Sequence, residues 1–148
     1  MPAGRAVLAL DVGDSRIGLA RADEGSSIAF GRGAMTRFGT TKDVEQVAEA
    51  AAEEGAVIVV VGLPRNMDGS ESQQTARVRA FAGALAQRLS RDGVEVVLED
   101  ERLTTRSAQR QIASSALPRG KRQERSRLDE AAAVLILESY LTKHGPES

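Results

Sequence analysis

A run of five apolar β-branched residues, Val57-Ile58-Val59-Val60-Val61, contains no polar side chain. Such a run is typical of a strand that is covered on both faces, because a strand with one face in water alternates apolar and polar residues. A second run, Ala6-Val7-Leu8-Ala9-Leu10, has the same character. Two strands of this kind need apolar layers on both sides, so we expect a central sheet between layers of helices.

The segments around these runs predict strands that alternate with helices. Strands are expected at residues 6–12, 17–22, within 27–36, at 57–61 and at 94–98. The first two should form an antiparallel hairpin, whereas the fourth and fifth follow helices and should run parallel to the first. Helices are expected after a Thr40 or Thr41 N-cap and ending at Gly55, after residues 70–72, from Thr104 or Thr105 to about Ala113, and at residues 129–141. The second helix should bury Val78, Phe81, Ala82, Leu85 and Leu89.

The composition limits the kinds of catalytic group that this chain can use. A chain of 148 residues suits one domain, residues 1–148, and no apolar stretch approaches the ~20 residues of a membrane span. The first residues lack the layout of a signal peptide, so we expect a cytoplasmic protein. There is no Cys, and the single His, His144, lies close to the C-terminus. Thiol and histidine-activated nucleophiles are therefore disfavoured, and carboxylate-bound Mg²⁺ or Mn²⁺ is the simplest hydrolytic centre that remains.

Carboxylates occur at the ends of three predicted elements. Asp11 follows the first apolar run, Asp100 and Glu101 close the fifth strand, and Asp129 opens the final helix. We interpret them as ligands of a divalent metal. Two of them also have ordinary structural interpretations. Asp11 could hold the turn at residues 13–15, and Asp129 with Ser126 matches a helix capping box. Glu130, the next residue, is expected to face solvent.

Only one residue of the acidic pair Asp100-Glu101 is expected to enter the metal site, because successive side chains of a strand face opposite ways. Asp100 has the parity of Val96 and Leu98, so periodicity alone points Asp100 inward. Glu101 has the parity of Glu99, a polar position. Asp100 therefore stays open as an alternative ligand or a supporting residue.

Four segments, in order, resemble the YqgF/RuvX family of Holliday-junction-resolvase-like proteins. They are Leu10-Asp11-Val12-Gly13 with Arg16-Ile17-Gly18, Val61-Gly62-Leu63-Pro64 with Asn66-Met67-Asp68-Gly69-Ser70, Asp100-Glu101-Arg102-Leu103-Thr104-Thr105, and Asp129 with residues 131–137. The resemblance implies a ribonuclease H-like α/β fold, with a five-stranded mixed sheet of order 3-2-1-4-5, strand 2 antiparallel and helices on its flanks. It also implies a metal-dependent nuclease with catalytic and metal-binding Asp11, Glu101 and Asp129.

The resemblance further implies a nucleic-acid substrate. Bacterial members of the family resemble enzymes that process the precursor of 16S ribosomal RNA, and branched DNA is the alternative substrate. Cleavage of a junction would require a homodimer, because it needs paired cuts. One departure is that related resolvases carry a glutamate on the fourth strand, which here ends in Gly62.

Basic residues give candidate contacts to the substrate. Arg16, Arg65 and Arg102 adjoin the acidic positions or the glycine loop at residues 62–70, and each could grip phosphate or pair with a neighbouring carboxylate. The loop itself could offer N–H groups to phosphate or be a plain connector. Residues 119–127 are expected to form a basic loop before the final helix, with Arg119, Lys121 and Arg122 as substrate contacts or as a solvated surface.

Aromatic residues are only 3% of the chain, so we expect contacts to phosphates rather than stacking of aromatic rings on bases. Two other functions remain open at this stage. Asp11-Val12-Gly13 with Gly18 also resembles the phosphate hairpin of actin-like ATPases, although those enzymes need two such domains. A non-catalytic binder of nucleic acid or ribosomes would keep the fold and the basic segment without using the carboxylates.

Overall fold

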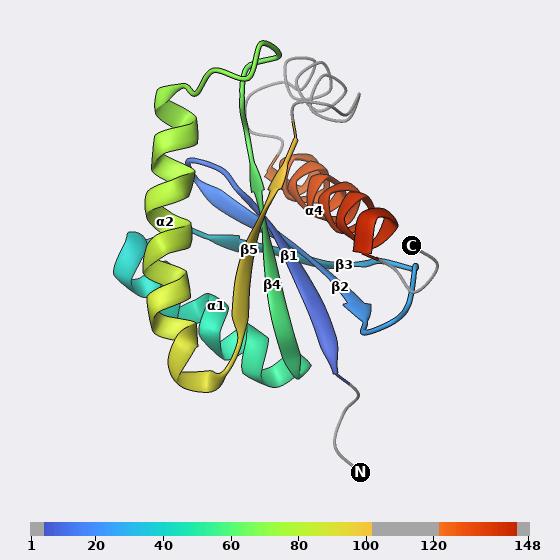
Figure 1. Ribbon diagram of the computed structural model, residues 1–148. Coiled ribbons are helices and arrows are strands. Elements are labelled where there is room, and N and C mark those ends of the chain that lie inside the picture. Colours follow the sequence, from blue (N-terminus) through green and yellow to red (C-terminus); the bar gives the residue numbers. More distant parts are fainter. Residues whose placement is uncertain (1–4, 102–121, 145–148) are drawn as a thin grey trace.

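The computed structural model describes residues 5–101 and 122–144, and of residues 122–126 it describes the backbone alone. A central sheet separates helices α1 and α2 on one face from helix α4 on the other (Figure 1). The strands are β1 (Ala6–Val12), β2 (Arg16–Asp23), β3 (Phe30–Thr36), β4 (Ala56–Leu63) and β5 (Glu95–Asp100). The helices are α1 (Thr40–Glu54), α2 (Gln73–Leu89), the short 3-10 helix η1 (Ser90–Asp92) and α4 (Arg122–His144).

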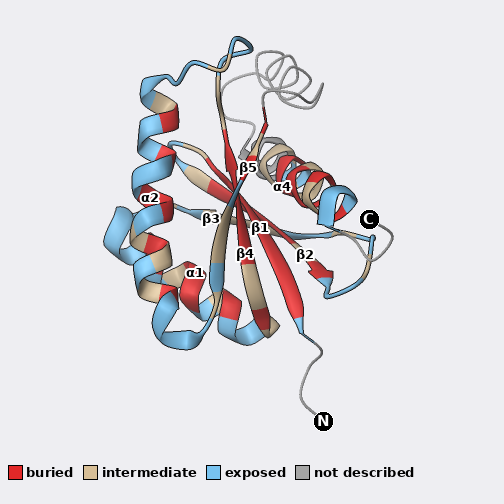
Figure 2. Ribbon diagram, in the orientation of Figure 1, coloured by how far each residue is buried: buried red, intermediate tan, exposed pale blue. Residues whose placement is uncertain are grey.

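The sheet has the strand order β3-β2-β1-β4-β5. Strand β2 is antiparallel to both neighbours, whereas β1, β4 and β5 run parallel. The expected five-stranded mixed sheet is therefore confirmed, with the central position of β1 and β4 explained by their apolar runs. Figure 2 shows these two strands as the most continuously buried part of the sheet.

Alternation along β1 divides its side chains between two apolar cores. Leu8 and Leu10 belong to the core under α1 and α2, together with Val59 and Val61 of β4 and all five predicted residues of the α2 stripe. Val7 and Ala9 belong to the core under α4. This alternation continues to Asp11, whose side chain therefore lies on the α4 face.

Helix α1 begins differently from the prediction. Its N-cap is Gly39, with no side-chain cap, and Thr40 is already the first helical residue. Asp43, in the first turn, instead fixes the chain that enters the helix, because its carboxylate accepts the N–H of Phe38 at 2.8 Å. Helix α2 follows the expected pattern, with Ser72 as N-cap and a capping box completed by Thr75.

Helix α4 begins at Arg122, seven residues before Asp129. The prediction that Asp129 opens this helix is therefore wrong, and so is its capping-box interpretation. Residues 122–127 belong to the helix rather than to a loop. The physical reason is that Arg, Gln and Glu are strong helix formers, and the single Ser126 does not interrupt them. The predicted helix from Thr104 or Thr105 to Ala113 lies outside the described residues.

Within residues 5–101 and 122–144, no helix is both long enough and apolar enough to cross a membrane.

The last described residues of α4 include Tyr140 and His144, whose rings stack with their centroids 4.3 Å apart. Burial, with a smaller contribution from Glu95 and Glu99, raises the pKa of Tyr140 above its ordinary value.

We expect Gly18→Ala to lower the free energy of unfolding by about 1–3 kcal/mol, because the added methyl would overlap with the backbone carbonyl of Asp129 and push α4 outward. Gly83→Ala in α2 is the matched control, since its methyl meets no atom within 4 Å. That change should stabilise by about 0.5–1 kcal/mol through helix propensity. Urea denaturation of both variants measures the difference, and equal stabilities would contradict the close packing of α4.

Candidate active site

The carboxyl ends of the parallel strands β1, β4 and β5 bring two acidic residues together on the α4 face. Asp11 lies near the end of β1, and Glu101 comes one residue after β5. Glu101 has the parity of Val97, which packs in the core under α4. Both acidic residues are buried, each with 7% of its surface exposed.

Gly62 of β4 provides the space between these two residues. Asp11 and Gly62 each follow the last registered pair of β1 and β4, Leu10 and Val61. A Cβ on Gly62 would lie 2.8 Å from Oε2 of Glu101 and 2.5 Å from Cδ1 of Ile136. The carboxylate of Glu101 therefore lies over Gly62, toward β1. Where related resolvases carry a glutamate on the fourth strand, this chain has Gly62, and the space above Gly62 is taken by the carboxylate of Glu101, which follows the fifth strand.

Asp100 points to the opposite face of the sheet. It shares the parity of Val96, which packs against the core under α1 and α2. Its carboxylate accepts a hydrogen bond from Nη1 of Arg65 at 3.0 Å. Only Glu101 of this pair therefore faces Asp11. Periodicity alone predicts that Asp100 points inward, and it does, but toward the core under α1 and α2 and not toward Asp11.

The third predicted ligand, Asp129, belongs to a turn of α4 that touches the sheet at Gly18. Gly18 is the partner of Asp11 in the β1–β2 ladder, and its missing side chain admits the backbone of Asp129. The carboxylate of Asp129 accepts a hydrogen bond from Nε of Arg16 at 2.7 Å. Arg16 is therefore paired with a carboxylate, which is the alternative left open by its position in the sequence.

The three carboxylates do not form a ligand group in the described structure. Across the described parts of the chain, no three Asp, Glu, His or Cys side chains form a group that could hold a metal ion. Asp11 and Glu101 share a face, and Asp129 reaches the same face but is bound to Arg16. The assignment of Asp11, Glu101 and Asp129 as metal ligands therefore stays a prediction.

Glu130 lies against the edge strand β3 rather than in solvent, so the expectation that it faces solvent is wrong. Its Oε2 accepts the N–H of Gly33 at 2.6 Å, and a Cβ on Gly31 would lie 2.5 Å from its carboxyl carbon. Gly31 lets α4 pack closely on this side. Together with Gly18, it explains why a helix carrying acidic residues lies so near the sheet.

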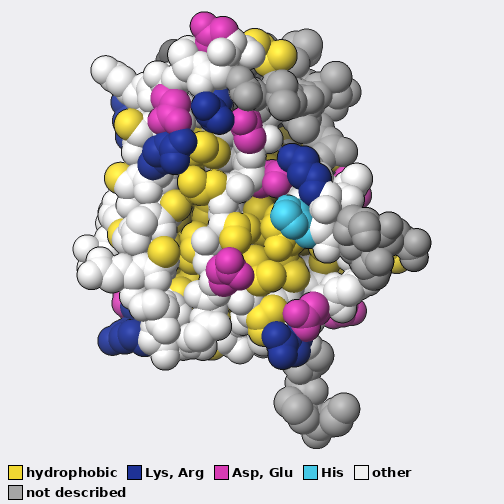
Figure 3. Space-filling model, viewed as in Figure 1, with side chains coloured by type: hydrophobic (Ala, Val, Ile, Leu, Met, Phe, Trp, Pro, Cys, Tyr) yellow, Lys and Arg dark blue, Asp and Glu magenta, His cyan; other side chains and the backbone are white. Residues whose placement is uncertain are grey.

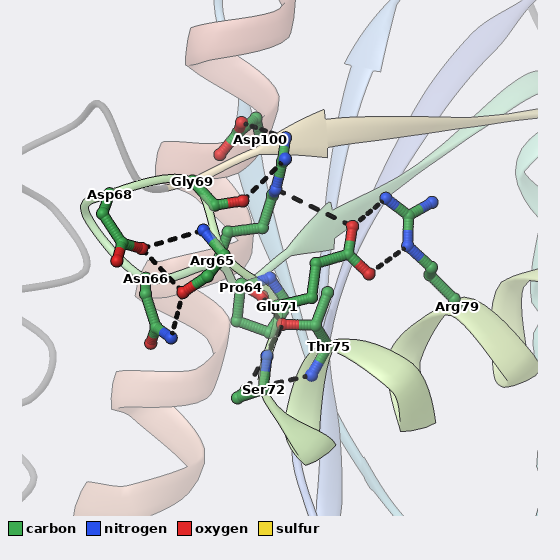
Figure 4. Close-up of polar contacts among 11 residues, drawn as sticks. Pro64, Arg65, Asn66, Asp68, Gly69, Glu71, Ser72, Thr75, Arg79 and Asp100 are labelled. Carbon is green, nitrogen blue, oxygen red and sulfur yellow. Dashed lines mark hydrogen bonds and ion pairs between the residues drawn. The ribbon is translucent and has the colours of Figure 1, made fainter.

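The connection between β4 and α2, residues 64–72, is braced by Arg65 (Figure 4). Arg65 donates to Asp100 at 3.0 Å and to the carbonyl oxygen of Gly69 at 2.9 Å. Glu71 is held by Arg79, and the hydrogen bond from Arg79 lowers the pKa of Glu71 below its ordinary value. Arg65 therefore has a structural role, and its contact with phosphate stays a prediction.

The same connection uses several of its N–H groups internally. The N–H of Asn66 donates to the carbonyl of Ser70, that of Gly69 to the carbonyl of Asn66, and that of Ser70 to Asp68. These three groups are not available to a phosphate without breaking a bond in the loop. The connector interpretation of the glycine loop is therefore favoured over a phosphate cradle.

An ion pair that sequence analysis missed supports the turn after Asp11. Asp43 of α1 is fully buried, and it accepts Nε of Arg37 at 2.8 Å. Arg37 also donates from Nη1 to the carbonyl oxygen of Gly13 at 2.9 Å, and its backbone N–H donates to Ser15. The pair thereby fixes the β1–β2 turn to α1. The only signal in the sequence was an acidic residue in the first turn of a predicted helix.

Other predicted contacts fall outside what the structure describes. Arg102, Arg119 and Lys121 lie outside the described residues, and Arg122 is described only by its helical backbone. Their roles in substrate binding stay predictions.

Comparison with known proteins identifies the family. The family model described as "RuvX: Holliday junction resolvase" matches residues 5–143. The chain belongs to the RuvX family. A relative from Thermus thermophilus, named "Putative pre-16S rRNA nuclease", is 44% identical over 135 residues, which cover 91% of this chain and 96% of the relative. A relative of the same name from Pelotomaculum thermopropionicum is 40% identical over 140 residues, covering 94% and 88% of the two chains.

Solved structures with low sequence identity share the fold of this RuvX-family chain. Thermus thermophilus RuvC in complex with a Holliday junction matches with a TM-score of 0.57 and 17% identity, covering 95% of this chain and 96% of RuvC. The fowlpox virus resolvase in complex with Holliday junction DNA matches with a TM-score of 0.54 and 14% identity, covering 94% and 98% of the two chains. The predicted family and the ribonuclease H-like fold are confirmed, and the expected nuclease agrees with the names of these relatives.

We expect Asp43→Ala to lower the free energy of unfolding by about 2–4 kcal/mol, because it leaves the partly buried Arg37 without its carboxylate. Asp23→Ala is the matched control. Asp23 pairs with Arg21 at 2.7 Å but is largely exposed, so its removal should cost less than about 1 kcal/mol. Denaturant melts of both variants provide the measurement. If Asp43→Ala lowers the free energy of unfolding no more than the control does, the buried Asp43–Arg37 ion pair does not stabilise the turn.

Proposed function

We propose that the protein is a divalent-metal-dependent nuclease that hydrolyses phosphodiester bonds of precursor 16S ribosomal RNA. The observation that carries this proposal is the pair of buried carboxylates, Asp11 and Glu101, on one face of the sheet with Gly62 between them. Carboxylate oxygens are the ligands that Mg²⁺ and Mn²⁺ prefer in proteins. The names of relatives about 40% identical to this chain support the choice of RNA.

The donor set suits a hard cation, provided that Asp129 changes its partner. Asp11 and Glu101 supply two carboxylates, and Asp129 lies at the adjoining turn of α4 with its carboxylate on Arg16. To become a third ligand, Asp129 exchanges Arg16 for the cation. Both side chains of this pair are only about one-quarter exposed, so Arg16 would need a new anionic partner when Asp129 leaves it. Bound there, Mg²⁺ or Mn²⁺ would supply an activated water and stabilise the departing oxygen.

Arg16 gains a role in the same exchange. Once Asp129 leaves it, the guanidinium of Arg16 is available at the edge of the site for a substrate phosphate, which it would hold by two parallel hydrogen bonds. Arg16 is the first residue of β2 and directly follows the β1–β2 turn, so its position relative to Asp11 is fixed by the hairpin. We therefore assign Arg16 to substrate orientation.

The remaining basic residues would contact the RNA backbone. Arg65, Arg102, Arg119, Lys121 and Arg122 keep this predicted role, with Arg65 also bracing its own loop. Affinity for RNA should then fall with salt, with a slope of about −0.7 per phosphate contact for a single strand. An enzyme acting on precursor ribosomal RNA would work in the cytoplasm, where that RNA is transcribed.

We expect Asp11→Asn to lower the cleavage rate of precursor 16S RNA by at least about 100-fold, because it removes a charged ligand from the buried pair. Asp14→Asn is the matched control, since Asp14 lies three residues away in an exposed turn and should leave the rate unchanged. The rates are measured with purified variants in Mg²⁺ and in Mn²⁺.

Purifying all variants in the same way also controls for a contaminating nuclease, because a contaminant would cleave equally in every preparation. If Asp11→Asn cleaves as fast as the wild type, the catalytic assignment is wrong. Metal-independent binding of RNA without cleavage would instead support a non-catalytic binding protein.

Holliday junction DNA is the second candidate substrate, favoured by the family description and by the fold shared with junction resolvases. Resolution of a junction needs symmetric paired cuts and therefore two active sites in a homodimer. Incubation of the protein with four-way junctions, together with its mass in solution, separates this candidate from the first. Paired cuts by a dimer would favour the junction, and cleavage of precursor RNA alone would favour the ribosomal role.

A further inference from the structure

Met67 is the most exposed large apolar side chain in the described part of the molecule, with 72% of its surface accessible. It lies in the connection between β4 and α2, which is the described segment that projects farthest at the upper end of the molecule (Figure 1). A side chain this exposed contributes little to the stability of the fold, because it buries almost no apolar area. The fold alone therefore gives no reason for methionine here.

The loop on both sides of Met67 is held in one conformation. Asn66 donates through its side chain to the hydroxyl of Ser70 at 2.8 Å, and Asp68 accepts both the N–H and the hydroxyl of Ser70, at 2.9 and 2.6 Å. The N–H of Gly69 donates to the carbonyl of Asn66 at 2.8 Å. The residue between these anchors is consequently presented outward on a braced loop, which lowers the entropy lost when it binds something.

The loop is also tied to the candidate active site. Leu63, just before it, accepts the backbone N–H of Glu101 at 3.2 Å. Arg65, which braces the loop through Gly69, donates to Asp100, the neighbour of Glu101. Met67 is therefore held at a fixed position relative to the buried carboxylates rather than on an independent arm.

The chemistry of the loop suits a base better than a phosphate. Its N–H groups at residues 66, 69 and 70 are used in its own hydrogen bonds, and it carries the acidic Asp68. Among the described residues, Figure 3 shows positive and negative side chains mixed at the upper end of this face. An exposed thioether chain offers apolar contact only, and methionine is among the residues that wedge against nucleic-acid bases.

Resting on the nuclease proposed above, we propose that Met67 is a specificity-determining wedge that packs against an unpaired base next to the cleaved phosphodiester of the RNA. The braced loop sets the distance between that base and the carboxylates of Asp11 and Glu101, so the wedge selects where the strand enters the site. The contact is apolar and adds no phosphate contact. It supplies base recognition that the small number of aromatic residues does not.

The test compares Met67→Ser with the wild type on two synthetic RNAs of equal length, one fully paired and one with a single unpaired nucleotide at the cleavage site. Binding is measured in Ca²⁺ at several salt concentrations. For the RNA with the unpaired nucleotide, Met67→Ser should raise Kd by about 5- to 100-fold, the range for losing one base contact. The slope of log K against log salt should stay unchanged, because no phosphate contact is lost.

Three controls make the result specific. Ile28→Ser removes a similarly exposed apolar side chain, 59% accessible, just before the start of β3 and outside the loop, and should change nothing. Met67→Phe should keep or strengthen binding. Thermal melts should show that Met67→Ser folds like the wild type.

The outcomes distinguish the wedge from the proposed function. If the wild type cleaves RNA and Met67→Ser binds both RNAs as the wild type does, the wedge is wrong and the nuclease stands. If the wild type neither cleaves precursor 16S RNA nor binds either synthetic RNA, the proposed function fails, and the wedge fails with it. A salt slope altered in Met67→Ser would also overturn the proposal, since it would indicate a lost phosphate contact.

Discussion

The close approach of α4 to the sheet at Gly18 governs the geometry of the candidate site. Because Gly18 is opposite Asp11 in the β1–β2 ladder, the absence of its side chain brings the backbone of Asp129 to the face that carries the Asp11 carboxylate. Any larger residue would move the helix away by steric overlap. Gly31 and Gly62 act in the same way, for Glu130 and for Glu101 respectively.

The two faces of the sheet are built from side chains of different size. Under α1 and α2, strands β1 and β2 present Leu8, Leu10, Ile17 and Leu19, which fill a thick apolar layer. Under α4 they present mostly small residues, among them Ala9, Ala20 and Ala22. Helix α4 consequently lies close to the sheet, and polar groups reach across the interface, as Ser139 and Lys143 do by donating to the buried Glu99 at 2.7 Å. A thick apolar core and a thinner layer crossed by polar contacts thus share one sheet.

Much of the fold followed from local patterns. The bounds of β1, the stripe of α2 and the Gly55 cap depend on neighbours a few residues apart, and the structure confirms all three. One error arose where a distant partner decided the outcome, and another had a local cause. Glu130 was expected in solvent, yet it bonds to Gly33, 97 residues away in the sequence. The start of α4 was placed too late because a capping pattern at Ser126 outweighed the helix-forming residues before it.

The sequence by itself determined the apolar runs of the central strands and the family, because apolar periodicity and short motifs are properties of neighbouring residues. The strand order followed from the resemblance to the family, and the structure confirms it. It left open which of Asp100 and Glu101 faces Asp11, since both strand faces are buried and parity alone does not say which core each face belongs to. The tertiary structure decided this by placing Glu101 over Gly62 and Asp100 against Arg65. It alone also paired Arg16 with Asp129, because that contact spans 113 residues and exists only once α4 packs on the sheet.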